Sequence, residues 1–185
     1  MINDALLDLQ NAQVGKVWGK YAGEVNDNAD QERMGRLQVR CKAVFGAELV
    51  WAMPCVPYAG PGVGFHFIPP KGAQVWVEFE GGDTSRAIWT GCFWAKDQMP
   101  DDAESADIKL IVTDKATLKI DDASGEVVIK NADDSSITWS GDVKTEAGAA
   151  THTVGADGVV SESTPGKVEV GAAGVTINNG AFKVS

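Results

Sequence analysis

The stretch YAGPGVGFHFIPPKGAQVWVEFEGGD, residues 58–83, decides how the first half of the chain folds. Its opening crowds glycine and proline around aromatic side chains, which is typical of tight turns. Its second part alternates: Val75, Val77 and Phe79 fall on one side of an extended chain, and polar or amphipathic residues fall between them. Successive side chains of a strand point to opposite faces, so this pattern predicts a half-buried strand.

Four further strand-like segments flank this one, each bounded by turn residues. They are GKVWGKYAGEV (15–25), GRLQVRCKAVFG (35–46), ELVWAMPCVPY (48–58) and SRAIWTGCFW (85–94). Five short strands with long connections are typical of a small closed barrel of the OB type. We therefore predict an all-β protein with an OB-fold domain over residues 15–95, and a sandwich fragment is the competing architecture.

Composition limits the function classes. The net charge is −10, with −2 in residues 1–100 and −8 in residues 101–185, so the acidic surface disfavours a nucleic-acid partner. The number of cysteines is odd, and none of the three (Cys41, Cys55 and Cys92) belongs to a CxxC pair. Their apolar surroundings predict buried free thiols, which fits assembly in a reducing cytoplasm. We expect no signal peptide and no membrane-spanning helix.

Two segments separate or precede the strand-rich regions. Residues 1–14 place Ile2, Leu6 and Leu9 on one helical face, which predicts a short amphipathic helix or arm. Residues 96–107, within AKDQMPDDAESAD, are polar and acidic and contain one proline, which is typical of a linker. We therefore expect a second domain to begin at residue 108.

Residues 108–185 carry a loose repeat of short alternating segments, about eight to ten residues apart, separated by Gly, Asp and Asn. Each segment has too few large apolar residues for a private core, and no helical pattern could cover the sheet. Repeats of this kind are stable when stacked, and three intertwined copies would bury the apolar faces on a shared axis. We predict a triple-stranded β-helix in a homotrimer, with these trimer-core candidates: Leu110, Leu118, Ile120, Val127, Ile129, Ile137, Trp139, Val168, Val170, Val175 and Ile177.

Catalytic and phosphate-binding interpretations have little support. The segment GPGVG lacks the Gly-Lys-Ser/Thr ending of a phosphate loop. Tyr58, Phe65, Phe67 and Trp76 could stack on bases or sugars, but no basic stripe accompanies them, so we expect packing roles. With two histidines and no nucleophile elbow, we expect no enzyme, no catalytic residue and no cofactor.

The sequence from MGRLQVR through WAMPCVPYAGPGVGFHFIPPKGAQVWVEFEGGDTSRAIWTGCFW resembles the OB-fold domain of contractile-tail spike proteins. These are the phage baseplate assembly protein V family and the spike region of type VI secretion VgrG proteins. The resemblance covers about 60 residues, and LKIDDASGEVVIKN and GVTINNGAFKVS are similar, more weakly, to the β-helix that follows. The matching positions are Gly35, Arg36, Val39, Trp51, Pro54, Ala59, Gly60, Gly64, Phe65, Pro69, Gly72, Val75, Val77, Phe79, Gly82, Asp83, Gly91 and Trp94.

The resemblance implies a non-enzymatic homotrimeric spike of a contractile device such as a phage tail baseplate. Its OB collar would join the hub or tail tube, and its β-helical needle would be pushed through the target cell envelope. Phe182 and Val184 are candidates for contact with a separate PAAR-like tip protein. The His-x-His iron motif of some short spikes is missing, and His152 is the one candidate for an axial metal ion. The alternative function is an OB-fold module that binds oligosaccharides or single strands.

Overall fold

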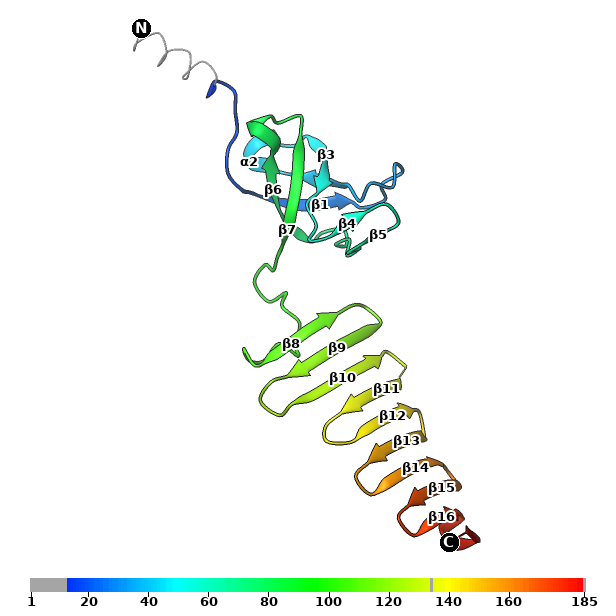
Figure 1. Cartoon of the computed structure of the whole chain (residues 1–185). Helices are drawn as coiled ribbons and strands as arrows, with labels where there is room; N and C mark the ends of the chain where they lie inside the picture. Colours follow the sequence, from blue (N-terminus) through cyan, green and yellow to red (C-terminus); the bar gives the residue numbers. More distant parts are fainter. Residues whose placement is uncertain (1–12, 134, 185) are drawn as a thin grey trace. The chain divides into compact units, whose positions relative to one another are not determined.

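The chain divides into two units, Met1–Gln98 and Met99–Ser185 (Figure 1). The computed structural model describes residues 13–133 and 135–184. Most of the predicted N-terminal helix or arm, residues 1–14, therefore lies outside the described residues. Both units are built mainly from strands, which confirms the all-β prediction.

Unit 1 is a closed barrel of five strands, in the order β1-β2-β3-β7-β6. All neighbours are antiparallel except β3 and β7, and that single parallel pair closes the barrel. A one-turn helix, α2, follows β2, and a two-stranded hairpin, β4–β5, leaves the barrel between β3 and β6. The strands are β1 (Tyr21–Asp27), β2 (Leu37–Arg40), β3 (Leu49–Pro54), β4 (Ala59–Gly60), β5 (Val63–Gly64), β6 (Gln74–Phe79) and β7 (Ala87–Phe93), with α2 at Lys42–Phe45 and η1 at Glu80–Gly82.

The barrel core comes from the alternation visible in the sequence. Val75 and Val77 of β6 are fully buried, and so are Leu37 and Val39 of β2, whereas the residues between them reach the outside. Burying a side chain of this size contributes about 1.5–3 kcal/mol. The barrel therefore holds a complete core within one chain.

The cysteine prediction is wrong for two of the three thiols. Cys41 is fully buried, and burial raises the pKa of its thiol. Cys55 and Cys92 are exposed because the alternation along their segments points them outward: Cys55 lies between partly buried Pro54 and Val56, and Cys92 follows partly buried Gly91. Apolar neighbours in sequence indicated a strand but not the face on which each cysteine lies.

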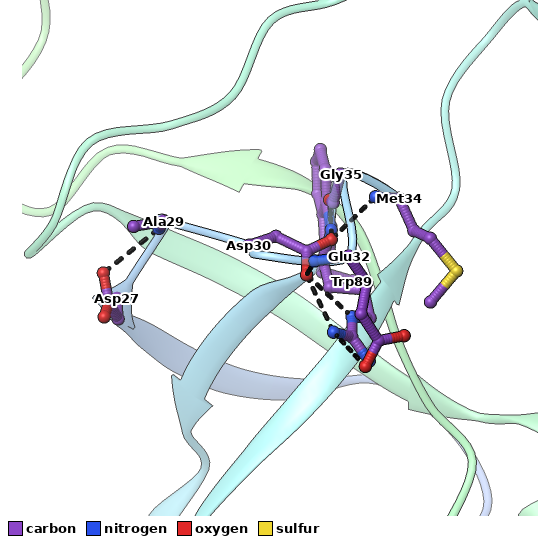
Figure 2. A network of polar contacts seen from close by, with 8 residues as sticks. Asp27, Ala29, Asp30, Glu32, Met34, Gly35 and Trp89 are labelled. Carbon is purple, nitrogen blue, oxygen red and sulfur yellow. Dashed lines mark hydrogen bonds and ion pairs between the residues drawn. The ribbon is translucent and has the colours of Figure 1, made fainter.

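A buried carboxylate fixes the loop between β1 and β2 (Figure 2). Asp30 accepts two hydrogen bonds from the Arg36 guanidinium, at 2.8 and 3.1 Å, and others from backbone N–H groups that include that of Met34 at 2.8 Å. Next to it, the Trp89 indole N–H donates to the Gly35 carbonyl oxygen at 3.1 Å. These bonds tie the loop both to itself and to β7.

The hydrogen bonds that Asp30 accepts lower its pKa far below the ordinary value, and those from the Arg36 guanidinium have the largest effect. A carboxyl whose pKa is depressed by folding stabilises the protein above the ordinary carboxyl range, and that contribution is lost as the pH falls through the folded value. We expect Asp30→Asn to lower the thermal midpoint of the barrel by several degrees at pH 7, and the difference from the unmodified chain to shrink toward pH 2. Thermal melts across this range measure it, with the exposed Asp97→Asn as control; equal midpoints for Asp30→Asn and the control would contradict the assignment.

Unit 2 is one antiparallel sheet of ten strands in which each strand pairs with the next along the chain (Figure 1). This confirms the short strands expected after residue 108, and β8 begins at Ile108. The ladder satisfies the backbone of every inner strand but leaves the sheet one layer thick. The strands are β8 (Ile108–Val112), β9 (Ala116–Asp121), β10 (Glu126–Asn131), β11 (Ser135–Trp139), β12 (Val143–Ala147), β13 (Ala150–Gly155), β14 (Gly158–Ser163), β15 (Gly166–Gly171), β16 (Gly174–Ile177) and β17 (Phe182–Val184), with η2 at Asn178–Gly180.

Candidate functional site

The cross-strand register sorts the side chains of unit 2 onto two faces, because directly opposed residues of an antiparallel pair share a face. We call one the apolar face. Its larger side chains form two parallel rows, beside a third row of small or polar residues such as Ala116, Ala147 and Ser163. The first row runs across β9 to β16 and holds only apolar residues: Ile120, Val127, Trp139, Val143, Val154, Val159, Val170 and Val175.

The second row of the apolar face runs beside the first, across β8 to β17. It is apolar at both ends and polar in the middle, where Thr145, His152 and Ser161 lie opposite one another on β12, β13 and β14. In order across the sheet its residues are Ile111, Leu118, Ile129, Ile137, Thr145, His152, Ser161, Val168, Ile177 and Phe182.

The structure brings ten of the eleven predicted trimer-core residues onto this face and leaves out Leu110. Leu110 lies opposite Lys119 on the other face, because the β8–β9 register pairs Ile111, and not Leu110, with Leu118. Phe182 ends the second row, and the backbone of Val184 pairs with Val175, although the side chain of Val184 lies outside the described residues.

Sequence reasoning missed four members of the apolar face: Ile111, Val143, Val154 and Val159. The first lies in a continuous apolar run, LIV, whose alternation is ambiguous. The other three lie in a segment rich in Thr, Gly and Ala, where each valine has no large apolar neighbour two residues away. The signal that could have found Val154 and Val159 is their symmetric placement around the turn GADG, which pairs them directly.

The apolar face is not covered by any residue that the structure describes. Ten of its apolar side chains are between 36% exposed, at Ile137, and 59% exposed, at Phe182, and the others are partly buried, whereas the buried barrel valines are at or near 0%. A contiguous exposed apolar surface that extends across ten strands marks an interaction site. The sheet therefore has a core-forming face but no core of its own.

The opposite face, which we call the charged face, carries most of the ionisable side chains of these strands; Lys109, opposite Ile120 on β8, and His152 lie on the apolar face. Lys144 pairs with Glu146 at 3.0 Å and Lys167 pairs with Glu169 at 2.9 Å, and Glu169 raises the pKa of Lys167. Such exposed pairs contribute little to stability. Their arrangement makes the sheet amphipathic, with one face suited to water and one suited to burial.

His152 lies in the middle of the apolar face, and its Nδ1 is 2.7 Å from Ser161 Oγ. Thr145 lies on its other side in the ladder. Within the described residues, no three His, Cys, Asp or Glu side chains come together in a group that could hold a metal ion. A single chain therefore offers one imidazole here, in a short polar interruption of the second row.

The packing role predicted for the barrel aromatics holds for one residue and fails for three. Trp76 packs against Phe93 in a tilted arrangement, with ring centroids 4.5 Å apart. Tyr58, Phe65 and Phe67, by contrast, are 50–59% exposed. They lie on or beside the β4–β5 hairpin, which leaves the barrel. The residues adjacent to them in sequence leave the barrel as well, so these residues cannot cover the three rings.

Comparison with known protein families decides what this barrel is. Residues 21–94 match the family model of the type VI secretion system/phage-baseplate injector OB domain. Unit 1 contains an injector OB domain. The match begins with β1 and ends one residue after β7, so it spans the whole closed barrel and confirms the resemblance drawn from the sequence.

The family match ends before unit 2, and no curated protein matches the chain. The match relates the barrel to the OB domain of phage-baseplate and type VI secretion injectors. The described helices include none that is long and apolar enough to cross a membrane.

The pairing of β13 to β15, which places their side chains on the apolar face, depends on a glycine in the turn between β13 and β14. Gly158 has a φ of +134°, and a Cβ at this position would overlap the backbone carbonyl oxygen of Val170 on β15. We expect Gly158→Ala to destabilise the β13–β15 pairing by more than the roughly 1–3 kcal/mol that an unfavourable backbone conformation costs alone. Gly148→Ala, at a φ of +55° with open space around it, is the matched control.

Amide hydrogen exchange of β13 to β15 measures this effect. Faster exchange in Gly158→Ala than in Gly148→Ala is the expected result. Equal exchange in the two variants would show that the close approach to β15 does not hold the register.

Proposed function

We propose that this chain is the structural, trimeric central spike of a contractile injection device, such as a phage tail baseplate. The observation that carries the proposal is the uncovered apolar face of unit 2, in a chain whose first unit contains an injector OB domain. The OB domains would form a collar attached to the hub or tail tube. The sheets of three chains would form the needle that enters the target cell envelope.

Self-association is supported because the apolar face matches itself. Its first row offers nothing but apolar side chains from β9 to β16, so a copy of the same face is a suitable cover. The face is also narrow, with two rows of larger side chains on strands of three to six residues. Three narrow ribbons can close as the sides of a prism and bury both rows of each, as in the triple-stranded β-helix that the resemblance implies.

The charge distribution supports the same arrangement. Ion-paired Lys and Glu side chains lie on the charged face, which would become the outside of the needle. Folding three copies together would then remove apolar surface from water without burying an unpaired charge. Rigidity and a water-compatible exterior are what a needle requires, and no catalytic group enters this mechanism.

The end of the needle is proposed to contact a separate tip protein of the PAAR type. Phe182 closes the second row of the apolar face at the last strand and is 59% exposed. An apolar side chain at the terminal layer offers a docking point for a cap. An oligosaccharide-binding module, the alternative function, would account for exposed aromatics on the barrel but not for the apolar face of unit 2.

Solution mass tests the trimer directly. We expect light scattering on a sizing column to give close to three times the 19.5 kDa of one chain. A mass of one chain at micromolar concentration would overturn the proposal. A mass of two chains would favour a sandwich of two sheets over the β-helix.

A pair of neighbouring substitutions tests which face is buried. Ile137→Asp would place three carboxylates inside the needle, each at a cost of several kcal/mol, and should abolish the trimer. Thr138→Asp changes the next residue of the same strand, on the charged face, and should leave the trimer intact. The masses of both variants provide the measurement, and a trimer from Ile137→Asp would contradict burial of the apolar face.

A further inference from the structure

The hairpin that leaves the barrel is an apolar arm whose outer surface no described residue covers. We call residues 56–67 the aromatic arm; they include the strands β4 and β5. No Asp, Glu, Lys or Arg occurs from residue 49 to residue 70, although such residues make up 23% of the chain. Tyr58, Val63, Phe65 and Phe67 are each at least half exposed.

The aromatic arm is ordered by its own contacts. The Phe65 N–H donates to the Tyr58 carbonyl oxygen at 2.8 Å, and β4 pairs with β5 through Ala59–Gly64 and Gly60–Val63. The rings of Phe65 and Phe67 stack with centroids 4.7 Å apart. These contacts hold the side chains together and leave their outer surfaces in water, so the arm presents a preformed apolar patch.

A groove lies between the aromatic arm and the loop that Asp30 fixes. It encloses about 850 Å³, and its apolar lining includes Met34, Pro54, Val56 and Ile68. The loop wall is held by the Asp30 bonds and by the Trp89 bond to Gly35 (Figure 2). The groove is therefore formed before any partner arrives.

We propose that, in the trimer, the aromatic arm of each chain packs into the groove of the neighbouring chain. This inference rests on the proposed trimer and adds a second self-contact, located in the OB domain. In the needle, one face of each copy would meet the other two at the three-fold axis. A contact between neighbouring OB domains around that axis is head-to-tail instead, so it joins two different patches on each copy. The arm and the groove are such a pair, and a chain's own arm cannot fill the groove because it forms one wall.

The chemistry of the groove favours a copy of the arm over a polar ligand. The arm is uncharged, and Asp30, the carboxylate beside the groove, is already engaged by Arg36 and the loop backbone. A sugar would need free hydrogen-bonding side chains placed around it, and the lining is instead largely glycine, proline and apolar residues. An apolar, glycine-rich hairpin suits the larger, apolar share of those walls, and the polar lining side chains of Arg33, Tyr58 and His66 are exposed and can stay hydrated.

Hydrogen exchange of the full-length chain tests this contact. We compare amides of residues 58–67 in the unmodified trimer with those in Ile137→Asp, at a concentration where the variant has the mass of one chain. We expect exchange in the arm to be at least tenfold slower in the trimer. The strand β6 (Gln74–Phe79), in the barrel core, is the internal control and should exchange equally in both.

The other outcomes each overturn the inference and can be told apart from failure of the proposed function. Equal, fast exchange of the arm in a trimer of confirmed mass would mean that the arm is free for another partner while the spike proposal stands. Equal, slow exchange would mean that the arm is protected within its own chain. An unmodified chain with the mass of one copy would remove the spike proposal itself. Val170→Asp replaces Ile137→Asp if β6 is not protected in that variant.

Discussion

A single layer of antiparallel strands cannot bury either of its faces, and the second unit depends on this constraint. Its ladder pairs each strand with the next, so the backbone of the inner strands is satisfied within the chain. Its side chains are not, because the face that gathers Ile137, Trp139 and Val170 has nothing over it among the described residues. Hydrogen bonds therefore define the shape of this unit, and burial by copies would supply the driving force that one chain lacks.

The barrel has the opposite balance. Its sheet closes on itself, so Leu37, Val39 and Val77 are buried in one chain, and Asp30 adds a fixed loop at the barrel's edge. The two units thus obtain their cores in different ways, one by closure and one by proposed association. The net charge follows this division, since −8 of the total −10 belongs to residues 101–185, where a needle would present a charged exterior.

The sequence allowed the barrel to be predicted well because its alternation is strict and its turns are marked by glycine and proline, as at Val75, Val77 and Gly72. In unit 2 it allowed the strands to be predicted but not always their faces. Ile108, Leu110 and Val112 alternate as cleanly as Leu118 and Ile120, yet they lie on the opposite face, because the turn and not the strand sets the register.

The aromatic arm failed prediction for a related reason. Aromatic residues between prolines were expected to pack, but packing requires a neighbouring surface, and no described residue supplies one for the outer faces of this hairpin. The candidate interface on the apolar face could be inferred from residues such as Ile129 and Val168, whereas Val143 became visible only through its cross-strand partners, Trp139 and Val154. Local pattern determines a strand, and the opposing strand determines what its side chains meet.

Two self-contacts in one chain would reinforce one another in the proposed trimer. Once the apolar faces of three chains have joined, the binding of each arm to its neighbour's groove becomes an intramolecular step. The connection between the units then sets the effective concentration for that step. Neither contact then needs to be strong alone. This fits the contact between the aromatic arm and the groove, and it fits the second row of the apolar face, which Thr145, His152 and Ser161 interrupt. Those three residues give up apolar contact in the middle of the sheet, and a collar that also holds the copies together would offset that loss without any change in the needle.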